Sequence, residues 1–289
     1  MNRRRFLHLS AAFACAPRFS EAATWRGRGL GAKVSLTLHG PREETDPVLA
    51  ALPAWLDAFE DEFSLYRPDS ALTRLNRQGF HAGSSRFHAL IDHVVQAHRL
   101  TGGLFDPTVQ PLWQALAQGH DPASAQALIG WHRVAVEHQA LRLGPGQRLT
   151  LNGIAQGYAT DLLKQQLAAR GFASGLVNLG EFSALGGPYR LGLSDPIHGQ
   201  VGQRSLSDLA IATSSPAALP LGQQTHILAP DGRAARWSTV SVEARSATMA
   251  DALSTAAVFM DRPALRRLKT EAELNRITLI DSSGHLTTL

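Results

Sequence analysis

The chain has 289 residues, 44% of them hydrophobic, with 28 Lys and Arg against 24 Asp and Glu. Residues 1–22 contain four of the arginines and one glutamate, which leaves 24 basic and 23 acidic residues in the remainder. This near balance argues against a surface that binds nucleic acid or an anionic membrane. Cys15 is the only cysteine, so no disulfide, thiol nucleophile or cysteine metal site is expected in residues 23–289.

The first residues predict a twin-arginine leader. Residues 2–7 read Asn-Arg-Arg-Arg-Phe-Leu and are followed by a mildly apolar run at residues 9–16 that is too short to span a bilayer. Cleavage after Ala22 is preferred to cleavage after Ala16, which divides the chain into a signal peptide, 1–22, and a mature protein, 23–289, exported folded to the periplasm. Lipid anchoring at Cys15 is not expected, because Phe13 puts a bulky ring where such signals need a small residue.

Apolar periodicity predicts the elements of the mature chain in order. They are a strand at 33–38, helices at 47–63 and 86–100, short strands at 133–136, 141–143 and 148–151, a helix at about 157–169, strands at 175–178, 190–193, 209–213, 226–228 and 239–243, a helix at 247–260 and a hairpin around 281–284. Strands outnumber helices without alternating strictly with them, which favours an α+β fold. No linker, repeat or apolar stretch long enough to span a membrane follows the leader, so a single compact domain is expected.

The predicted helix at 247–260 carries the first candidate site. With Ser246 as N-cap, Asp251 lies beyond the first turn, so the helix dipole does not account for it. Asp251 and Thr255 are four residues apart and share one face of a helix that is otherwise small and apolar. Hard oxygens presented in this way suit Mg²⁺. The alternative is an Asp251 paired with an arginine and a Thr255 hydroxyl bonded to its own backbone.

Other segments suggest ligand contacts. Residues 151–161 run from a strand through a turn containing Gly153 and Gly157 into a helix, an arrangement that binds phosphate but that also occurs in ordinary strand-to-helix turns. Segments 66–76 and 103–113 each place an aromatic ring beside a helix start, which alone is also typical of a helix cap. His226 lies at a predicted strand end, where a lone histidine is usually structural. The motifs of phosphate loops, zinc proteases and α/β-hydrolases are absent.

Taken together and in order, these segments resemble the ApbE family of FAD:protein FMN transferases. The resemblance covers almost all of residues 23–289. The matching motifs are Tyr66-x-Pro68-x-Ser70, Gly103-x-Phe105-Asp106-x-Thr108, Gly153-Ile154-Ala155-x-Gly157-Tyr158-Ala159, Asn178-Leu179-Gly180, Ala212-Thr213-Ser214, His226-Ile227 and Ala250-Asp251-Ala252 followed by Thr255. The fold that it implies is ApbE-like and T-fold-related, with mixed or antiparallel sheets and packed helices.

The resemblance also implies roles for individual residues. Mg²⁺ would be held by the carbonyl of Ala155, the carboxylate of Asp251 and the hydroxyl of Thr255, with Ser254 nearby. His226 would accept a proton from a Ser or Thr of an exported or membrane flavoprotein, which would attack the FMN phosphorus of FAD and release AMP. Asp251 and His226 are thus the expected catalytic residues. The expected flavin or adenine contacts are Leu30, Tyr66, Ser70, Leu104, Phe105, Asp106, Asn152, Gln156, Tyr158, His226 and Ile227.

Four positions depart from the family pattern. Gln156 stands where Lys is common, Glu181 follows Gly180 where a second Gly is usual, Ser215 replaces a Gly, and Ala229 replaces an Asp. These departures leave the expected metal ligands in place but affect the expected substrate contacts. Two further hypotheses therefore remain: an FAD pyrophosphatase that uses water in place of the acceptor, and a non-catalytic FAD-binding accessory protein of a periplasmic respiratory complex.

Overall fold

The computed structural model describes residues 22–137, 140–222 and 224–289. The predicted leader, apart from Ala22, and the possible lipid site at Cys15 lie outside the described residues. None of the helices in the described part of the chain is long and apolar enough to cross a membrane.

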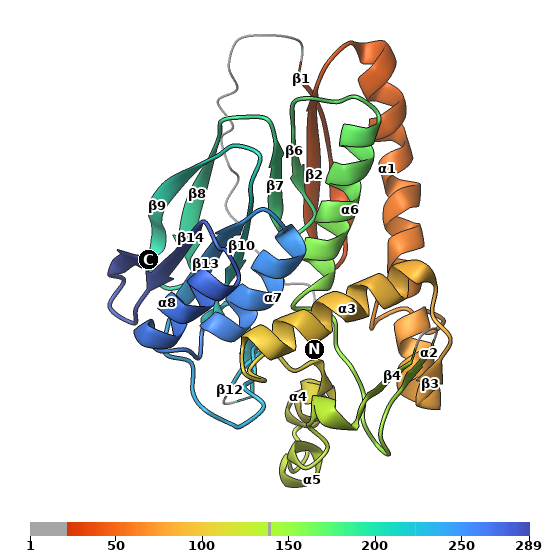
Figure 1. The fold of residues 1–289 in the computed structure, drawn as a ribbon, viewed down its shortest axis with the longest axis vertical. Helices are drawn as coiled ribbons and strands as arrows, with labels where there is room; N and C mark the ends of the chain where they lie inside the picture. Colours follow the sequence, from red (N-terminus) through yellow and green to blue (C-terminus); the bar gives the residue numbers. More distant parts are fainter. Residues whose placement is uncertain (1–21, 138–139, 223) are drawn as a thin grey trace.

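An antiparallel sheet of eight strands forms the centre of the fold (Figure 1). Along β2, Val34, Leu36 and Leu38 are buried and alternate with less buried residues, as a strand with one face on the core requires. In sheet order the strands are β1 (Ala22–Gly29), β2 (Ala32–His39), β6 (Gly175–Asn178), β7 (Phe182–Leu185), β10 (Ala210–Ser214), β13 (Thr239–Ala244), β14 (Arg276–Ile280) and β15 (Leu286–Thr288).

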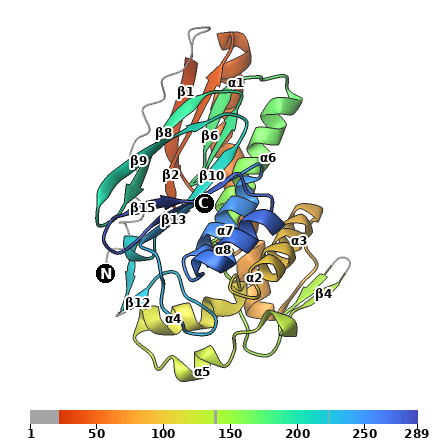
Figure 2. The ribbon, with the colours of Figure 1, turned by 60° about the vertical axis from the view of Figure 1, so that its left-hand side comes forward.

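Helices cover one face of this sheet and a hairpin covers the other. The helical layer consists of α1 (Arg42–Phe63), α3 (Ser85–Leu100), α6 (Ala155–Ala169), α7 (Ala247–Ala257) and α8 (Arg262–Glu271). On the other face, the hairpin of β8 (Tyr189–Asp195) and β9 (Gly199–Leu206) packs Tyr189, Leu191 and Leu206 against Leu176 and Ile211 of the sheet. Figure 2 shows this hairpin on the side of the sheet opposite α6.

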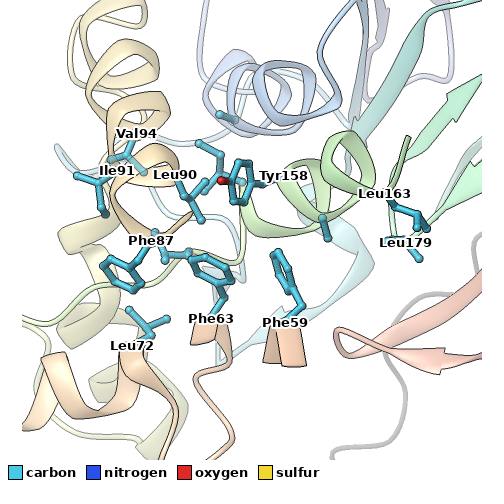
Figure 3. Close-up of a cluster of buried hydrophobic side chains, with 14 of the residues drawn as sticks. Phe59, Phe63, Leu72, Phe87, Leu90, Ile91, Val94, Tyr158, Leu163 and Leu179 are labelled. Carbon is cyan, nitrogen blue, oxygen red and sulfur yellow. The ribbon is translucent and has the colours of Figure 1, made fainter. Parts of the chain in front are cut away.

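The main apolar core lies between the helices and the β1–β2 end of the sheet. Figure 3 shows its aromatic centre, in which Phe59 and Phe63 of α1, Phe87 of α3 and Tyr158 of α6 meet. The ring centroids of Phe63 and Phe87 lie 5.7 Å apart, and those of Phe63 and Tyr158 lie 5.9 Å apart. Such ring contacts add to the free energy gained by burying the side chains.

Short elements complete the fold beside the main sheet. They are α2 (Ala71–Gln78), β3 (Phe80–His81), η1 (Pro107–Val109), α4 (Gln110–Gln118), α5 (Ala123–Gln126), η2 (Trp131–Arg133), β4 (Ala135–Glu137), β5 (Ala140–Arg142), η3 (Pro216–Ala218), β11 (Pro220–Leu221) and β12 (Gln224–Thr225). The single-domain α+β fold expected from the sequence is confirmed, and its sheets are antiparallel throughout the described residues.

Two predicted strands are wrong. Residues 148–151 form no strand, because the side chain of Asn76 bonds both the N–H and the carbonyl of Leu149, which a strand would use for sheet pairing. Residues 226–228 also form none: β12 ends at Thr225, whose hydroxyl donates to the carbonyl of Ile227. The periodicity also missed β7, β9, α4 and α8, which are short or mostly polar.

Helices α6 and α7 approach each other closely at Gly157. A Cβ atom on this residue would lie 2.3 Å from the carbonyl oxygen of Ala247 and 2.8 Å from the Cβ of Asp251, so the contact requires glycine. One turn further along α6, the Asp161 carboxylate caps α7. It accepts from the N–H groups of Ala247 at 2.8 Å and Thr248 at 2.9 Å.

We expect Asp161→Ala to lower the free energy of unfolding by roughly 2–4 kcal/mol, because it leaves two buried N–H groups at the start of α7 without an acceptor. Urea denaturation followed by far-UV circular dichroism measures this loss. Asp46→Ala, at an exposed position of α1, is the matched control and should stay within about 0.5 kcal/mol of the parent. Equal small losses in both variants would contradict the capping role.

Candidate functional site

Asp251 lies in the second turn of α7 and is buried, with 5% of its surface exposed. Its Oδ2 accepts a hydrogen bond of 3.0 Å from the N–H of Gly157 in the first turn of α6. No arginine, lysine or histidine forms an ion pair with Asp251 among the described residues. The hypothesis of an arginine partner for this carboxylate is therefore wrong.

Three hydroxyl groups gather beside Asp251. Ser254 Oγ and Thr255 Oγ1 donate to the Asp251 carbonyl at 3.0 and 3.1 Å, so the backbone bond expected of Thr255 in the alternative interpretation is present. Ser214 at the end of β10 lies 2.8 Å from Ser254 and 3.4 Å from Thr255, measured between hydroxyl oxygens. Three hydroxyl oxygens from α7 and β10 thus gather close to the backbone carbonyl of Asp251.

The turn that leads into α6 passes directly over this region. A Cβ atom on Gly153 would lie 2.9 Å from Thr255 Oγ1, so the backbone of this turn comes close to the hydroxyl and favours a small residue here. Ala155, the expected carbonyl ligand, is the first residue of α6 and lies between this contact and the Gly157 contact with Asp251. The structure therefore brings together the segments of all four expected metal ligands, Ala155, Asp251, Ser254 and Thr255.

Glu181 is a further acidic residue in this region that sequence reasoning did not place there. Its side chain is buried, with 8% of the residue exposed, and Oε2 accepts from the N–H of Thr213 at 3.1 Å. Burial, and then the neighbouring charge of Asp251, raise the pKa of Glu181 well above its ordinary value. Burial likewise raises the pKa of Asp251 to about 7. The only indication of this residue in the sequence was that Glu181 stands after Gly180, where the family usually has a second glycine.

Gln156 has a definite contact of its own. Its Nε2 donates to the carbonyl of Leu30 at 3.0 Å, while the N–H of Leu30 donates to Glu60 Oε1 at 2.5 Å. Leu30 and Gly31 form the two-residue turn between β1 and β2, and both have positive φ angles, 52° and 76°. The Glu60 carboxylate is in turn held by Arg67 Nη2 at 2.7 Å. We call the two hydrogen bonds of Leu30, one from Gln156 and one to Glu60, the Leu30 clamp.

The other expected contacts divide into buried and accessible residues. Ser70 caps α2, and Tyr158 is buried in the aromatic core with its hydroxyl bonded to the carbonyl of Arg86. Phe105 is buried, and Asp106 accepts from Thr108 and Trp131. Tyr66 and Asn152 are exposed, whereas Leu104 and Ile227 are half-buried.

A cavity of about 460 Å³ lies beside several of these residues. It is lined in part by Leu104 and Asp106 of the Gly-Leu-Phe-Asp segment, together with Gly103, Pro230 and Arg233. Its size is in the range of small-molecule sites. The segment predicted to contact a dinucleotide therefore borders a cavity.

His226 lies between β12 and β13. Its ring Nδ1 is 3.3 Å from the carbonyl oxygen of Leu219, and burial lowers its pKa below the ordinary value. The imidazole is therefore neutral near pH 7 and able to accept a proton.

Two of the residues that depart from the family pattern have structural contacts. The hydroxyl groups of Ser215 and Thr239 of β13 are hydrogen-bonded at 2.8 Å, and Ala229 is buried in the apolar cluster around α7 and β13.

Comparison with known proteins identifies the family. The sequence model described as "ApbE family" matches residues 30–278. The chain belongs to the ApbE family. It is 27% identical over 262 residues to the FAD:protein FMN transferase of Vibrio cholerae, covering 78% of this chain and 76% of the relative. It is 30% identical over 179 residues to the FAD:protein FMN transferase of Salmonella typhimurium, covering 53% and 51%.

Solved structures show the same fold. The ApbE flavin transferase of Vibrio cholerae matches with a TM-score of 0.77 at 22% identity, over 93% of this chain and 97% of that chain. The ApbE protein of Thermotoga maritima matches with a TM-score of 0.82 at 23% identity, over 92% and 96%. The ApbE-like fold expected from the sequence is thus confirmed.

The oxygen set around Asp251 in this ApbE chain fits a hard divalent cation. No group of three or more His, Cys, Asp and Glu placed to hold a metal occurs within residues 22–137, 140–222 and 224–289. The described residues nevertheless include two buried carboxylates without a basic partner, Asp251 and Glu181. Three hydroxyl groups, of Ser214, Ser254 and Thr255, lie close to the backbone carbonyl of Asp251. Oxygen ligands of this kind suit Mg²⁺ or Ca²⁺ and do not suit softer metals.

We expect Gln156→Ala to weaken FAD binding several-fold, because it frees the Leu30 carbonyl in a turn that the resemblance places against the flavin or the adenine of FAD. The lost hydrogen bond should also lower the free energy of unfolding by about 1 kcal/mol. Fluorescence titration with FAD and urea denaturation measure the two effects. Gln165→Ala, exposed on the same helix, should change neither. Reduced stability with unchanged FAD affinity would show that the Leu30 clamp serves folding alone.

The raised pKa of Asp251 predicts how the stability of the metal-free protein depends on pH. The Asp251 carboxyl has a pKa of about 7 in the folded protein. It therefore stabilises the fold at pH values below the pKa that it has in the unfolded chain, and this contribution is lost as the pH rises through about 7. We expect the free energy of unfolding in EDTA to fall by roughly 2–4 kcal/mol more between about pH 5 and pH 8 in the parent than in Asp251→Asn. Parallel pH profiles would contradict this assignment.

Proposed function

We propose that this chain is a Mg²⁺-dependent FAD:protein FMN transferase that moves FMN from FAD to a Ser or Thr of an acceptor flavoprotein. The observation that carries the proposal is the convergence of Asp251, Thr255 and the start of α6 on one buried, oxygen-lined region. The names of the relatives from Vibrio cholerae and Salmonella typhimurium support the same reaction.

In this proposal Asp251, Thr255 and the carbonyl of Ala155 hold Mg²⁺, with Ser254 adjacent. When bound, the ion would neutralise negative charge on the pyrophosphate of FAD. The N–H of Gly157 fixes one oxygen of Asp251, which would leave the other oxygen of the carboxylate for the cation. The close α6–α7 contact keeps these groups at a constant separation.

The protein's own residues would handle the proton. His226, neutral because burial lowers its pKa, accepts the proton of the acceptor hydroxyl as the oxygen forms a bond to the FMN phosphorus. The bond between that phosphorus and the bridging oxygen breaks, and AMP leaves with the electron pair. Leu30, Tyr66, Leu104 and Ile227 would hold FAD beside this centre.

We further propose that the reaction takes place in the periplasm. The twin-arginine pattern in residues 2–7 motivates this location. Export in a folded state suits a protein whose site is assembled from residues as distant in sequence as Leu30 and Thr255. The acceptor would then be an exported protein or the periplasmic part of a membrane flavoprotein.

An acceptor-labelling assay tests the reaction. Incubation of residues 23–289 with FAD, Mg²⁺ and an acceptor protein of a related transferase should produce flavin fluorescence on the acceptor in a denaturing gel. Asp251→Asn should reduce the labelling rate by roughly 100-fold or more, since it removes a charged metal ligand. Asp46→Asn, on the exposed face of α1, should label at the parental rate.

The same assay distinguishes the two other hypotheses. Release of AMP in the absence of acceptor, without labelling when acceptor is present, would indicate an FAD pyrophosphatase. Binding of FAD with neither labelling nor AMP release would indicate an accessory protein and would contradict the proposed transfer reaction.

A further inference from the structure

Two buried carboxylates of the described chain, Asp251 and Glu181, have no basic partner. Asp251 and Glu181 are 5% and 8% exposed, and the charge of Asp251 acts on Glu181. No ion pair with Arg, Lys or His is made by either residue in the described part of the chain. Two like charges in a low-dielectric site repel and are poorly solvated, so a divalent cation bound by both carboxylates would stabilise their ionised forms.

Each carboxylate has one oxygen committed to the backbone and one oxygen left over. Asp251 Oδ2 accepts from the N–H of Gly157, and Glu181 Oε2 accepts from the N–H of Thr213. Asp251 Oδ1 and Glu181 Oε1 form no hydrogen bond with any residue that the structure describes. These two oxygens therefore remain available to a cation, and carboxylate oxygens are ligands that hard divalent cations prefer.

The strand that holds Glu181 also supplies hydroxyl oxygen to the metal region. Thr213, which donates to Glu181, is followed in β10 by Ser214, whose hydroxyl lies 2.8 Å from Ser254 and 3.4 Å from Thr255. Glu181 is therefore fixed to the same backbone segment as the hydroxyl cluster that surrounds Asp251.

The side chain at position 156 is neutral and supplies no positive charge to balance the carboxylate of Glu181. A Cβ atom on Gly180 would lie 2.5 Å from Cδ of Gln156, so this neutral amide packs directly against the residue that precedes Glu181. A lysine at 156 would bring a positive charge to this place. The amide instead donates to Leu30 and leaves Glu181 without a basic partner.

We propose that Glu181 is a second carboxylate ligand of the divalent cation held by Asp251. The two negative charges of the carboxylates then balance the two positive charges of the metal. This inference rests on the metal site of the proposed function. A site with two carboxylates binds a divalent cation by itself, whereas a site with one depends more on the phosphates of the substrate. The chain should accordingly hold the cation before FAD arrives.

Mn²⁺ binding in the absence of FAD tests this inference, with isothermal titration calorimetry and the electron paramagnetic resonance signal of free Mn²⁺ as readouts. Residues 23–289 should bind one Mn²⁺, and Glu181→Gln should weaken the binding by at least about tenfold. Asp251→Asn should weaken it at least as much. Glu43→Gln, an exposed carboxylate in the first turn of α1, should bind as the parent does.

Thermal unfolding distinguishes a loss of metal binding in Glu181→Gln from a loss of folding stability. In EDTA, Glu181→Gln should melt at a higher temperature than the parent, because it removes the repulsion between the two carboxylates. Saturating Mn²⁺ should raise the melting temperature of the parent more than that of the variant. A variant destabilised in EDTA that gains as much from Mn²⁺ as the parent would show that Glu181 only shares a proton with Asp251, and would overturn the inference.

The outcomes separate this inference from the proposed function. Loss of Mn²⁺ binding in Asp251→Asn but not in Glu181→Gln overturns the role of Glu181 and leaves the metal site of the transferase intact. Absence of Mn²⁺ binding to the parent, with and without FAD, overturns both. Acceptor labelling with normal Mn²⁺ affinity in Glu181→Gln supports the transferase and contradicts the second ligand.

Discussion

The contact between α6 and α7 at Gly157 is the constraint on which the site depends. Because this residue has no side chain, its N–H reaches the Asp251 carboxylate at 3.0 Å and the backbone of α6 lies against Ala247. The Asp161 cap then fixes the start of α7 one turn further along. A larger residue at 157 would separate the helices and move Asp251 away from the turn at Gly153. The packing of the two helices and the geometry of the site therefore depend on the same backbone contact.

The sequence predicted the parts of the site that depend on local geometry. The shared face of Asp251 and Thr255 follows from helical spacing, and the glycine turn before α6 follows from residue type. The order of the motifs identified the family, which the match to residues 30–278 confirms. Local pattern was sufficient in these cases because each feature lies within one element and its cap.

The errors came from tertiary contacts. Residues 148–151 have the alternation of a strand, yet Asn76, more than 70 positions earlier, bonds the backbone of Leu149. Glu181 is brought to Asp251 by the pairing of β7 with β10 and the packing of α7 on that strand, which no spacing in the sequence reveals. The sequence left open whether the segments of Ser70 and Asp106 form helix caps or ligand contacts, because a motif alone does not distinguish the two; in the structure both side chains are caps.

The Leu30 clamp also affects how the edge of the sheet is held. None of the residues of β1 is fully buried, so apolar burial does not set the alignment of this edge strand, and such strands tend to slip or pair with other chains. Glu60 from α1 and Gln156 from α6 instead fix the turn at the end of the hairpin. A shift of one residue would break both bonds, so the turn expected to contact FAD also protects the sheet against mispairing and edge-to-edge aggregation.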